Sequence, residues 1–402
     1  MAAHLRRHAT TGNGSMTNSG KTGGATASAG EDPGGDTSVS RRPDPQDRSS
    51  QRPGTDGSST TGSGTTGSGT TGSGTDGAGD RSSAKTRGRL LSWQLGVATL
   101  AVLALLAASL LTGVYDIFGA ADGAEMFQIT RIPRTVALVL AGAAMAMCGL
   151  VMQLLTQNRF VEPTTTGTTE WAGLGLMLTV IIYPEATILQ RMIGAILAAF
   201  IGTLIFFLFL RRVSLKSSLI VPIVGIMLGA VVGAITTFIA VSTDMLQNLS
   251  IWFAGSFTSI LRGQYEVLWI VAIVVVAVFI TADRFTVAGL GKEISTSVGL
   301  KYNQVILVGT ILVAIATGVV TVVVGYLPFL GLIVPNIVSM VRGDDLRSNL
   351  PWVCLLGIAI VTVCDLIGRL IIAPFEVPVS LILGIVGAAV FIALILRQRR
   401  RG

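Results

Sequence analysis

Apolar runs separated by short polar segments make up most of the chain from about residue 92 onward. A helix needs about 20 apolar residues to cross the roughly 30 Å hydrocarbon core of a bilayer. Ten runs approach this length, although the third and the eighth are interrupted or short. They cover residues 92–114, 134–155, 168–184, 189–210, 218–241, 265–281, 305–326, 329–341, 352–371 and 380–396. The pattern predicts an all-α, polytopic membrane protein with about ten transmembrane helices.

The first 88 residues have the opposite character and consist mostly of Gly, Ser, Thr, Pro and Asp. The pentapeptide TTGSG occurs three times between Thr60 and Gly74. Such a segment buries too little apolar surface to offset its chain entropy, so we expect residues 1–88 to form a disordered cytoplasmic tail. Residues 89–402 then form the transmembrane domain. Ser15–Thr22, SMTNSGKT, lacks the first glycine of a P-loop and the flanking strand and helix, so we expect no ATP site in this chain.

Composition narrows the classes of function. Half of the 402 residues are apolar and only 13% are charged, against about 25% in an average soluble domain. The net charge of +7 is compatible with nucleic-acid binding, but most basic residues flank apolar runs, where they set membrane topology. Both histidines, His4 and His8, lie in the tail, and the three cysteines lack metal-type spacing. We therefore expect no cofactor, no metal site and no nucleic-acid partner.

Lys and Arg also predict the orientation, because loops on the cytoplasmic side are enriched in them. With the tail inside, the inner loops carry most of the basic residues, and both termini are cytoplasmic. This orientation corresponds to a multi-pass protein of the cytoplasmic membrane. The outer side retains Arg131, Arg134, Arg191, Arg262 and Arg369.

Charged groups on the outer side leave two readings open. Arg131, Arg134 and Arg369 either anchor to lipid phosphates or dock an acidic partner. Asp365 precedes Arg369 by four residues, which places the two side chains on one helix face and favours an ion pair. An acid within a span is otherwise a candidate proton or ion carrier, and this applies to Asp365 and Glu376.

A polar segment at about residues 282–304 separates two of the apolar runs and can lie only outside the bilayer. Within it, Glu293–Val298 is compatible with a short helix, and Gly299 follows as a helix stop. Such a segment is either a solvated loop or the contact for a separate motor protein.

Two further segments interrupt the apolar pattern. Gly325–Pro335, GYLPFLGLIVP, predicts irregular backbone at membrane depth, which is tolerated only where protein or a cavity covers it. It is therefore a candidate wall of a translocation path. Pro374–Ser380, PFEVPVS, is bounded by prolines, and we expect a re-entrant or interfacial helix there.

Eight motifs in order resemble the permease subunits of ABC importers for ferric siderophores and vitamin B12, over about residue 92 to the C-terminus. These are RIPR (131–134), GLVMQ (149–153), NRFVEPTTTG (158–167), WFAGS (252–256), GLGKEISTSVGL (289–300), FLGLIVP (329–335), CDLIGR (364–369) and PFEVP (374–378). The resemblance implies a type II ABC importer permease fold that works as a dimer by alternating access. It also implies a pair of cytoplasmic ATPase subunits, an extracytoplasmic solute-binding protein or lipoprotein, and a second permease, identical or different.

The same resemblance implies roles for individual residues. Arg131, Arg134 and Arg369 match the outer arginines that pair with glutamates of the binding protein. The segment that contacts the ATPase corresponds to Gly291, Lys292, Glu293, Ser297, Gly299 and Leu300. We expect the translocation path and gate at Gly142, Gln153, Pro163, Gly167, Gly331, Pro335 and Asn336.

The cargo and the driving force have alternatives. The chain departs from many family members at Asn336, Ser339 and Leu346, and with the PTTTGT run at Pro163–Thr168 this favours a ferric siderophore over cobalamin or haem. An ion-gradient-driven transporter would use Asp365 or Glu376 as its carrier, and no repeat of two half-length units supports it. No nucleophile–base pair favours a membrane enzyme.

Overall fold

The computed structural model describes residues 81–113, 122–212 and 220–399, and these are almost entirely helical. The chain divides into a unit of residues 1–74 and a unit of residues 75–402, and only the second contains described residues. The expected disordered tail therefore lies, as far as residue 80, outside the described part of the chain. The remaining residues of that tail begin a helix at Arg81.

Within the described residues, eight helical stretches are long and apolar enough to cross a membrane, and two apolar helices are shorter. The long ones contain α1 (Arg81–Leu111), α3 (Ile132–Thr156), α5 (Ile188–Arg212), α6 (Ile220–Ser242), α8 (Trp269–Gly289), α10 (Tyr302–Val323), α12 (Leu346–Leu370) and α13 (Val379–Arg399). The shorter ones are α4 (Thr168–Ile182) and α11 (Leu330–Arg342). Ten runs were predicted, with the third and eighth short, and α4 and α11 are those two.

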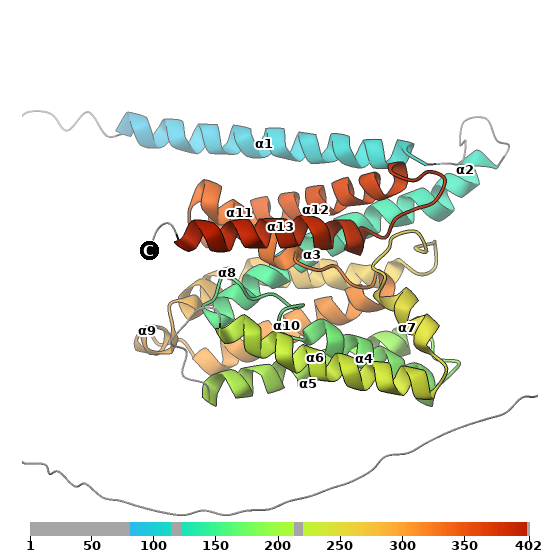
Figure 1. The fold of residues 1–402 in the computed structure, drawn as a ribbon. Coiled ribbons are helices and arrows are strands. Elements are labelled where there is room, and N and C mark those ends of the chain that lie inside the picture. Colours follow the sequence, from blue (N-terminus) through green and yellow to red (C-terminus); the bar gives the residue numbers. More distant parts are fainter. Residues whose placement is uncertain (1–80, 114–121, 213–219, 400–402) are drawn as a thin grey trace, which may run out of the picture. The chain divides into compact units, whose positions relative to one another are not determined.

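Short helices lie at the two ends of the bundle (Figure 1). α9 (Lys292–Ser297) connects α8 to α10 at one end, which we call the α9 end. α2 (Gly123–Met126), the π-helical turn η1 (Phe127–Arg131) and α7 (Leu246–Phe253) lie at the opposite end, which we call the α7 end. The 3-10 turn η2 (Glu266–Leu268) leads into α8.

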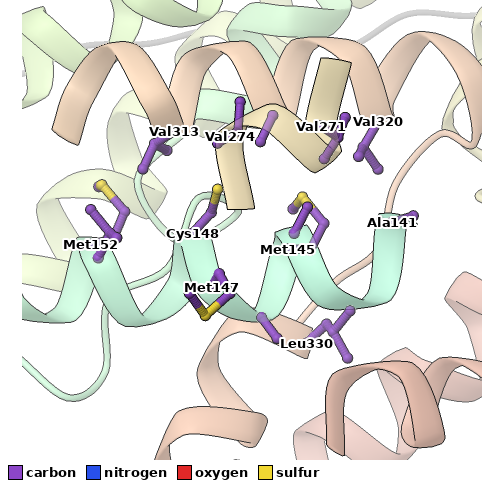
Figure 2. Packing of buried hydrophobic residues seen from close by; sticks show 14 of the residues in the cluster. Ala141, Met145, Met147, Cys148, Met152, Val271, Val274, Val313, Val320 and Leu330 are labelled. Atoms are coloured by element: carbon purple, nitrogen blue, oxygen red, sulfur yellow. The ribbon is translucent and has the colours of Figure 1, made fainter. Parts of the chain in front are cut away.

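Helix α3 forms the centre of the bundle and is the most buried span, with 83% of its apolar window inside the protein. Met145, Cys148 and Met152 face valines of α8 and α10, whereas Met147 faces Leu330 of α11 (Figure 2). Lipid tails are as apolar as these side chains, so helix association in a bilayer depends on close packing more than on the hydrophobic effect. Flexible methionines and small alanines allow that close packing around α3.

Glycines bring α3 into backbone contact with two neighbours. A Cβ atom on Gly142 would lie 3.0 Å from the carbonyl oxygen of Gly357 in α12. A Cβ atom on Gly331 in α11 would lie 2.8 Å from the Cα atom of Gly149. Any side chain at these four positions would therefore separate the helices.

Helices α4 and α11 both begin inside the protein, each after a buried irregular segment. Residues 160–169 are buried throughout, and Gly167 reaches φ +78° immediately before α4. Gly325, at φ +95°, begins the turn that leads to α11. The expected break at Gly325–Pro335 is therefore present up to Phe329, and its backbone is covered by protein, as backbone at membrane depth requires.

The expected helix at Pro374–Ser380 is wrong. Ile372 and Phe375 form an isolated bridge around a tight turn, and helix α13 begins only at Val379. Val377 N donates to Gly368 O at 2.9 Å, so the segment pairs with the end of α12. Pro374 and Pro378 have no N–H to donate, which explains why an extended connection replaces a helix here.

Candidate functional site

Helix α9 is a rigid projection whose end matches the predicted glycine stop. Gly299 adopts φ +84°, Leu300 N donates to Ser295 O at 2.9 Å, and Gly299 N donates to Thr296 O at 3.0 Å. These two bonds form a Schellman motif, in which the left-handed residue satisfies the last carbonyl groups of the helix. The buried Ser295 hydroxyl also donates to Val287 O at 2.8 Å, which fastens α9 to the end of α8.

Apolar side chains on and beside α9 are exposed. Leu290, Ile294 and Val298 are 58%, 50% and 71% accessible. The predicted contact residues Lys292, Glu293 and Ser297 are exposed on the same short helix, and Gly291 begins it at φ +105°. An apolar patch surrounded by polar residues is typical of a protein-binding surface.

Arginines at the α7 end form an ion-pair network within the chain. Asp365 accepts from Arg134, with Nη2 to Oδ1 at 2.7 Å, and pairs with Arg369 on its other oxygen. Arg134 reaches Glu376 with Nη1 to Oε2 at 2.9 Å. The Asp365 side chain has no exposed surface, and those of Arg134 and Arg369 are 14% and 6% exposed. The residues of this network belong to α3, α12 and the connection before α13, so their ion pairs hold these three segments together.

Further contacts extend the network to α1. Arg369 Nη1 donates to Ser109 O at 3.0 Å, and Arg131 Nη1 donates to Leu110 O at 2.9 Å. Burial raises the pKa of Glu376, but the Thr258 hydrogen bond and the charge of Arg134 outweigh it and leave that pKa below its ordinary value. Glu376 is thus held as a carboxylate.

The predicted Asp365–Arg369 pair is confirmed by this geometry. It was predicted from the spacing of four residues, whereas the pairing of Arg134 with Asp365 spans 231 residues and was missed. The docking role of the three arginines stays a prediction. Arg134 and Arg369 already have carboxylate partners in the chain, and Arg131 is half-buried at the end of η1.

The predicted path residues fall into two groups. Gln153, Pro335 and Asn336 line one cavity of about 380 Å³ between α3, α8, α11 and α12 at the α9 end. Asn336 Nδ2 donates to Arg159 O at 2.8 Å there. Gln153 Nε2 donates to Gly331 O at 3.3 Å, which connects this cavity to the backbone contact between α3 and α11.

The second group lies in packed backbone. Gly142 is buried against α12, and Gly167 lies against α6, where a Cβ atom would be 3.0 Å from Gly229 Cα. Pro163 is buried and its carbonyl accepts from Thr168 N at 3.1 Å. None of these three residues lines the cavity of about 380 Å³.

Glu162 is a functional candidate that the sequence analysis missed. Its side chain is fully buried, and Oε1 accepts from Phe329 N at 2.8 Å and from the Thr164 hydroxyl. Phe329 is the N-cap residue of α11, so the carboxylate lies at the positive end of that helix. The contact joins the irregular segment before α4 to the one before α11.

Glu170 in the first turn of α4 was also missed. Its Oε1 atom accepts from the Tyr326 hydroxyl at 3.3 Å, and both residues line a cavity of about 450 Å³ beside α6 and α7. A signal was present, since Glu162 and Glu170 are acids within or beside the third apolar run. The sequence pattern pointed only to Asp365 and Glu376 as intramembrane acids.

Comparison with known proteins gives consistent matches over the helical part of the chain. A model of the FecCD transport family matches residues 94–397. A petrobactin import system permease protein of Bacillus anthracis, FatD, is 61% identical over 304 residues, covering 76% of this chain and 91% of the relative. YclN of Bacillus subtilis, also a petrobactin import permease, is 43% identical over 67% of this chain and 85% of its own length.

More distant similarity extends to other iron chelates and to solved structures. The ferric-anguibactin permease FatD of Vibrio anguillarum is 38% identical over 67% of this chain and 85% of its own length. A metal-chelate type ABC transporter solved in an inward-facing conformation has a TM-score of 0.66 and 21% identity. That alignment covers 76% of this chain and 99% of the solved chain, and it shows the same fold.

Proposed function

This chain belongs to the FecCD transport family, and we propose from that membership that its cargo is a ferric siderophore of the petrobactin class. It is a multi-pass permease subunit of an ATP-driven siderophore importer. The choice of petrobactin is supported by the names of two relatives that are 61% and 43% identical to it. Two vitamin B12 permeases are also similar, at 32% and 31% identity.

The observation that supports an external motor is the surface of α9. A loop that met only water would have no reason to expose Leu290, Ile294 and Val298 together. We infer that a pair of cytoplasmic ATPase subunits covers this patch, one on each permease. Because Ser295 fastens α9 to the end of α8, a push on α9 would move the adjoining span with it.

This assignment places the α9 end in the cytoplasm and the α7 end outside the cytoplasmic membrane. Arg81 and Arg399, the two ends of the described helical part, then lie on the cytoplasmic side, as the distribution of Lys and Arg predicted. An extracytoplasmic binding protein would deliver the chelate at the α7 end, near Arg131, Arg134 and Arg369. A second permease, identical or different, would complete the path.

Transport would proceed by alternating access without bond chemistry in this chain. ATP binding closes the ATPase pair, the movement passes through α9, and the spans around the path tilt. What the permease contributes is a coupling free energy between the motor contact and the gate. In the ion-driven alternative Asp365 would carry the ion, but it is buried between Arg134 and Arg369, and this pairing leaves it a poor carrier.

The test is uptake of radiolabelled ferric petrobactin by membrane vesicles that contain the complete importer. We expect uptake with ATP inside the vesicle, and none when the ATPase subunit carries an inactive nucleotide site. Uptake driven by a proton or sodium gradient without ATP would contradict the proposal. Uptake of ferric anguibactin or cobalamin in place of ferric petrobactin would contradict only the choice of cargo.

A further inference from the structure

One cavity of the bundle contains a carboxylate that no predicted role explains. The cavity has a volume of about 450 Å³ and lies between α4, α6, α7 and the turn before α11. Its wall includes Glu170, Gly233, Thr236, Ser250, Phe253 and Tyr326. Glu170 is the one acid on this wall, and no Lys, Arg or His of the described chain lines it.

The carboxylate of Glu170 is only partly satisfied. Oε1 accepts from the Tyr326 hydroxyl at 3.3 Å, a long bond. Oε2 is buried and has no hydrogen-bond partner among the described residues. A buried acid with an open acceptor position is costly inside a membrane unless a partner completes it.

The hydroxyl groups of the cavity do not supply that partner. Thr236 donates to Val232 O at 2.8 Å, and Thr237 donates to Gly233 O at 2.9 Å. Ser250 donates to Leu246 O at 3.0 Å. Each donor is thus directed at its own helix, and none of these hydroxyl groups completes Glu170.

The remaining wall suits a cation. The rings of Phe253 and Tyr326 lie 6.3 Å apart beside the carboxylate, and aromatic faces attract ammonium groups. Glycines keep the space open: a Cβ atom on Gly229 would lie 3.5 Å from Glu170 Oε2, and one on Gly233 would meet nothing within 4 Å. A carboxylate is unfavourable against lipid tails, which favours a position of this wall on the path.

We propose that this cavity binds a cationic nitrogen of the cargo during passage, with Glu170 as its counter-charge. The inference rests on the proposed import function and adds a chemical requirement to it: chelates that carry a protonated amine are preferred to the same chelates without the charge. Tyr326 positions the carboxylate, and the ammonium group approaches it from the cavity.

The test compares two cargoes in vesicles that contain the complete importer. One is a ferric catecholate chelate that carries a free amine, and the other is the same chelate with that amine acetylated. We expect the wild-type importer to favour the amine by about tenfold in the ratio of uptake rate to KM, a difference typical of one charge-assisted hydrogen bond. Glu170→Gln should reduce this preference to about one, chiefly by slowing uptake of the amine-bearing chelate.

Matched variants separate binding from structural damage. Glu185→Gln removes an exposed acid in the turn after α4 and should keep the preference. Tyr326→Phe keeps the carboxylate but removes the hydroxyl that positions it, so it should weaken the preference without abolishing it. Gly233→Leu fills the cavity and should slow both cargoes, whereas Gly96→Leu, which also enters open space, should not.

The outcomes distinguish this inference from the import function itself. If neither chelate enters with ATP, the proposed function fails. If both enter and the wild type shows no preference, or Glu170→Gln lowers both uptake rates equally, the cation site is wrong and Glu170 serves only to hold Tyr326.

Discussion

Asp365 of α12 lies against Arg134 of α3, with Oδ1 2.7 Å from Nη2, and its other oxygen pairs with Arg369. One carboxylate therefore pairs with two guanidinium groups, and Glu376 supplies the second negative charge through its pair with Arg134. Removing one partner of a buried pair is costly because the remaining charge stays buried.

Asp365→Asn should consequently destabilise the fold by about 3–5 kcal/mol, the usual cost of breaking a buried ion pair. A lowered Tm of the purified complex in detergent would show this. The control is Asp283→Asn, which breaks a pair with Arg347 whose side chains are 69% and 79% exposed. Exposed pairs contribute little, so its Tm should be nearly unchanged. Equal Tm values for the two variants would mean that the network at the α7 end does not stabilise the fold.

Arg131 is the most suitable of the three arginines for a test of binding-protein docking, because Arg134 and Arg369 hold the buried Asp365 between them. Arg131→Glu should weaken binding of the purified binding protein by at least about tenfold, since it places a like charge against an acidic partner. Affinity is measured on the complex in nanodiscs at two salt concentrations.

Arg262→Glu provides the control for that measurement, because Arg262 is an exposed arginine at the α7 end and has no predicted docking role. Its effect should be small. An unchanged affinity for Arg131→Glu would return this arginine to the role of a lipid-phosphate anchor.

Gly299 should control coupling between ATP hydrolysis and uptake. Its φ of +84° costs a β-branched residue about 1–2 kcal/mol, although a Cβ atom would meet nothing within 4 Å. Gly299→Val should therefore leave the bundle folded but distort the end of α9. We expect ATP hydrolysis to continue while uptake falls severalfold.

Asparagine tolerates the left-handed region, so Gly299→Asn should retain most of the coupling. The ratio of transported iron to hydrolysed ATP is the measurement for both variants. Normal uptake by Gly299→Val would show that α9 does not transmit the motor's movement.

A single methyl group at the contact between Gly149 and Gly331 should destabilise the protein. Gly149→Ala places a Cβ atom on the backbone of Gly331, and overpacking of this kind costs typically about 1–3 kcal/mol. Gly96→Ala enters open space in α1 and should be neutral or slightly stabilising. Thermal unfolding of the two variants gives the comparison, and a Gly149→Ala protein as stable as wild type would contradict the close approach of α3 and α11.

Features that depend on neighbouring residues could be predicted from the sequence. Run length predicted ten apolar helices, two of them short. A glycine after a polar stretch predicted the end of α9, and a spacing of four predicted the Asp365–Arg369 pair. The helix expected at Pro374–Ser380 was wrong, because pairing of Val377 with Gly368 competes with a helix that two prolines already weaken.

Features that depend on tertiary contact could not be predicted. Glu162 and Phe329 are 167 residues apart, and Arg134 and Asp365 are 231 residues apart. Nothing in their local sequence indicates that they meet. Glu170 is different: its position in an apolar run was a visible signal, and only its contact with Tyr326, 156 residues away, needed the structure.

The glycine contacts of α3 also constrain how the protein can move. Where the backbones of two helices touch, neither helix can slide along the other without a side chain colliding with the backbone of the neighbouring helix. Helices α3, α11 and α12 are thus expected to move together as one rigid unit. Changes in the shape of the path then involve more loosely packed spans such as α6 and α13, which have only 28% and 17% of their apolar windows buried.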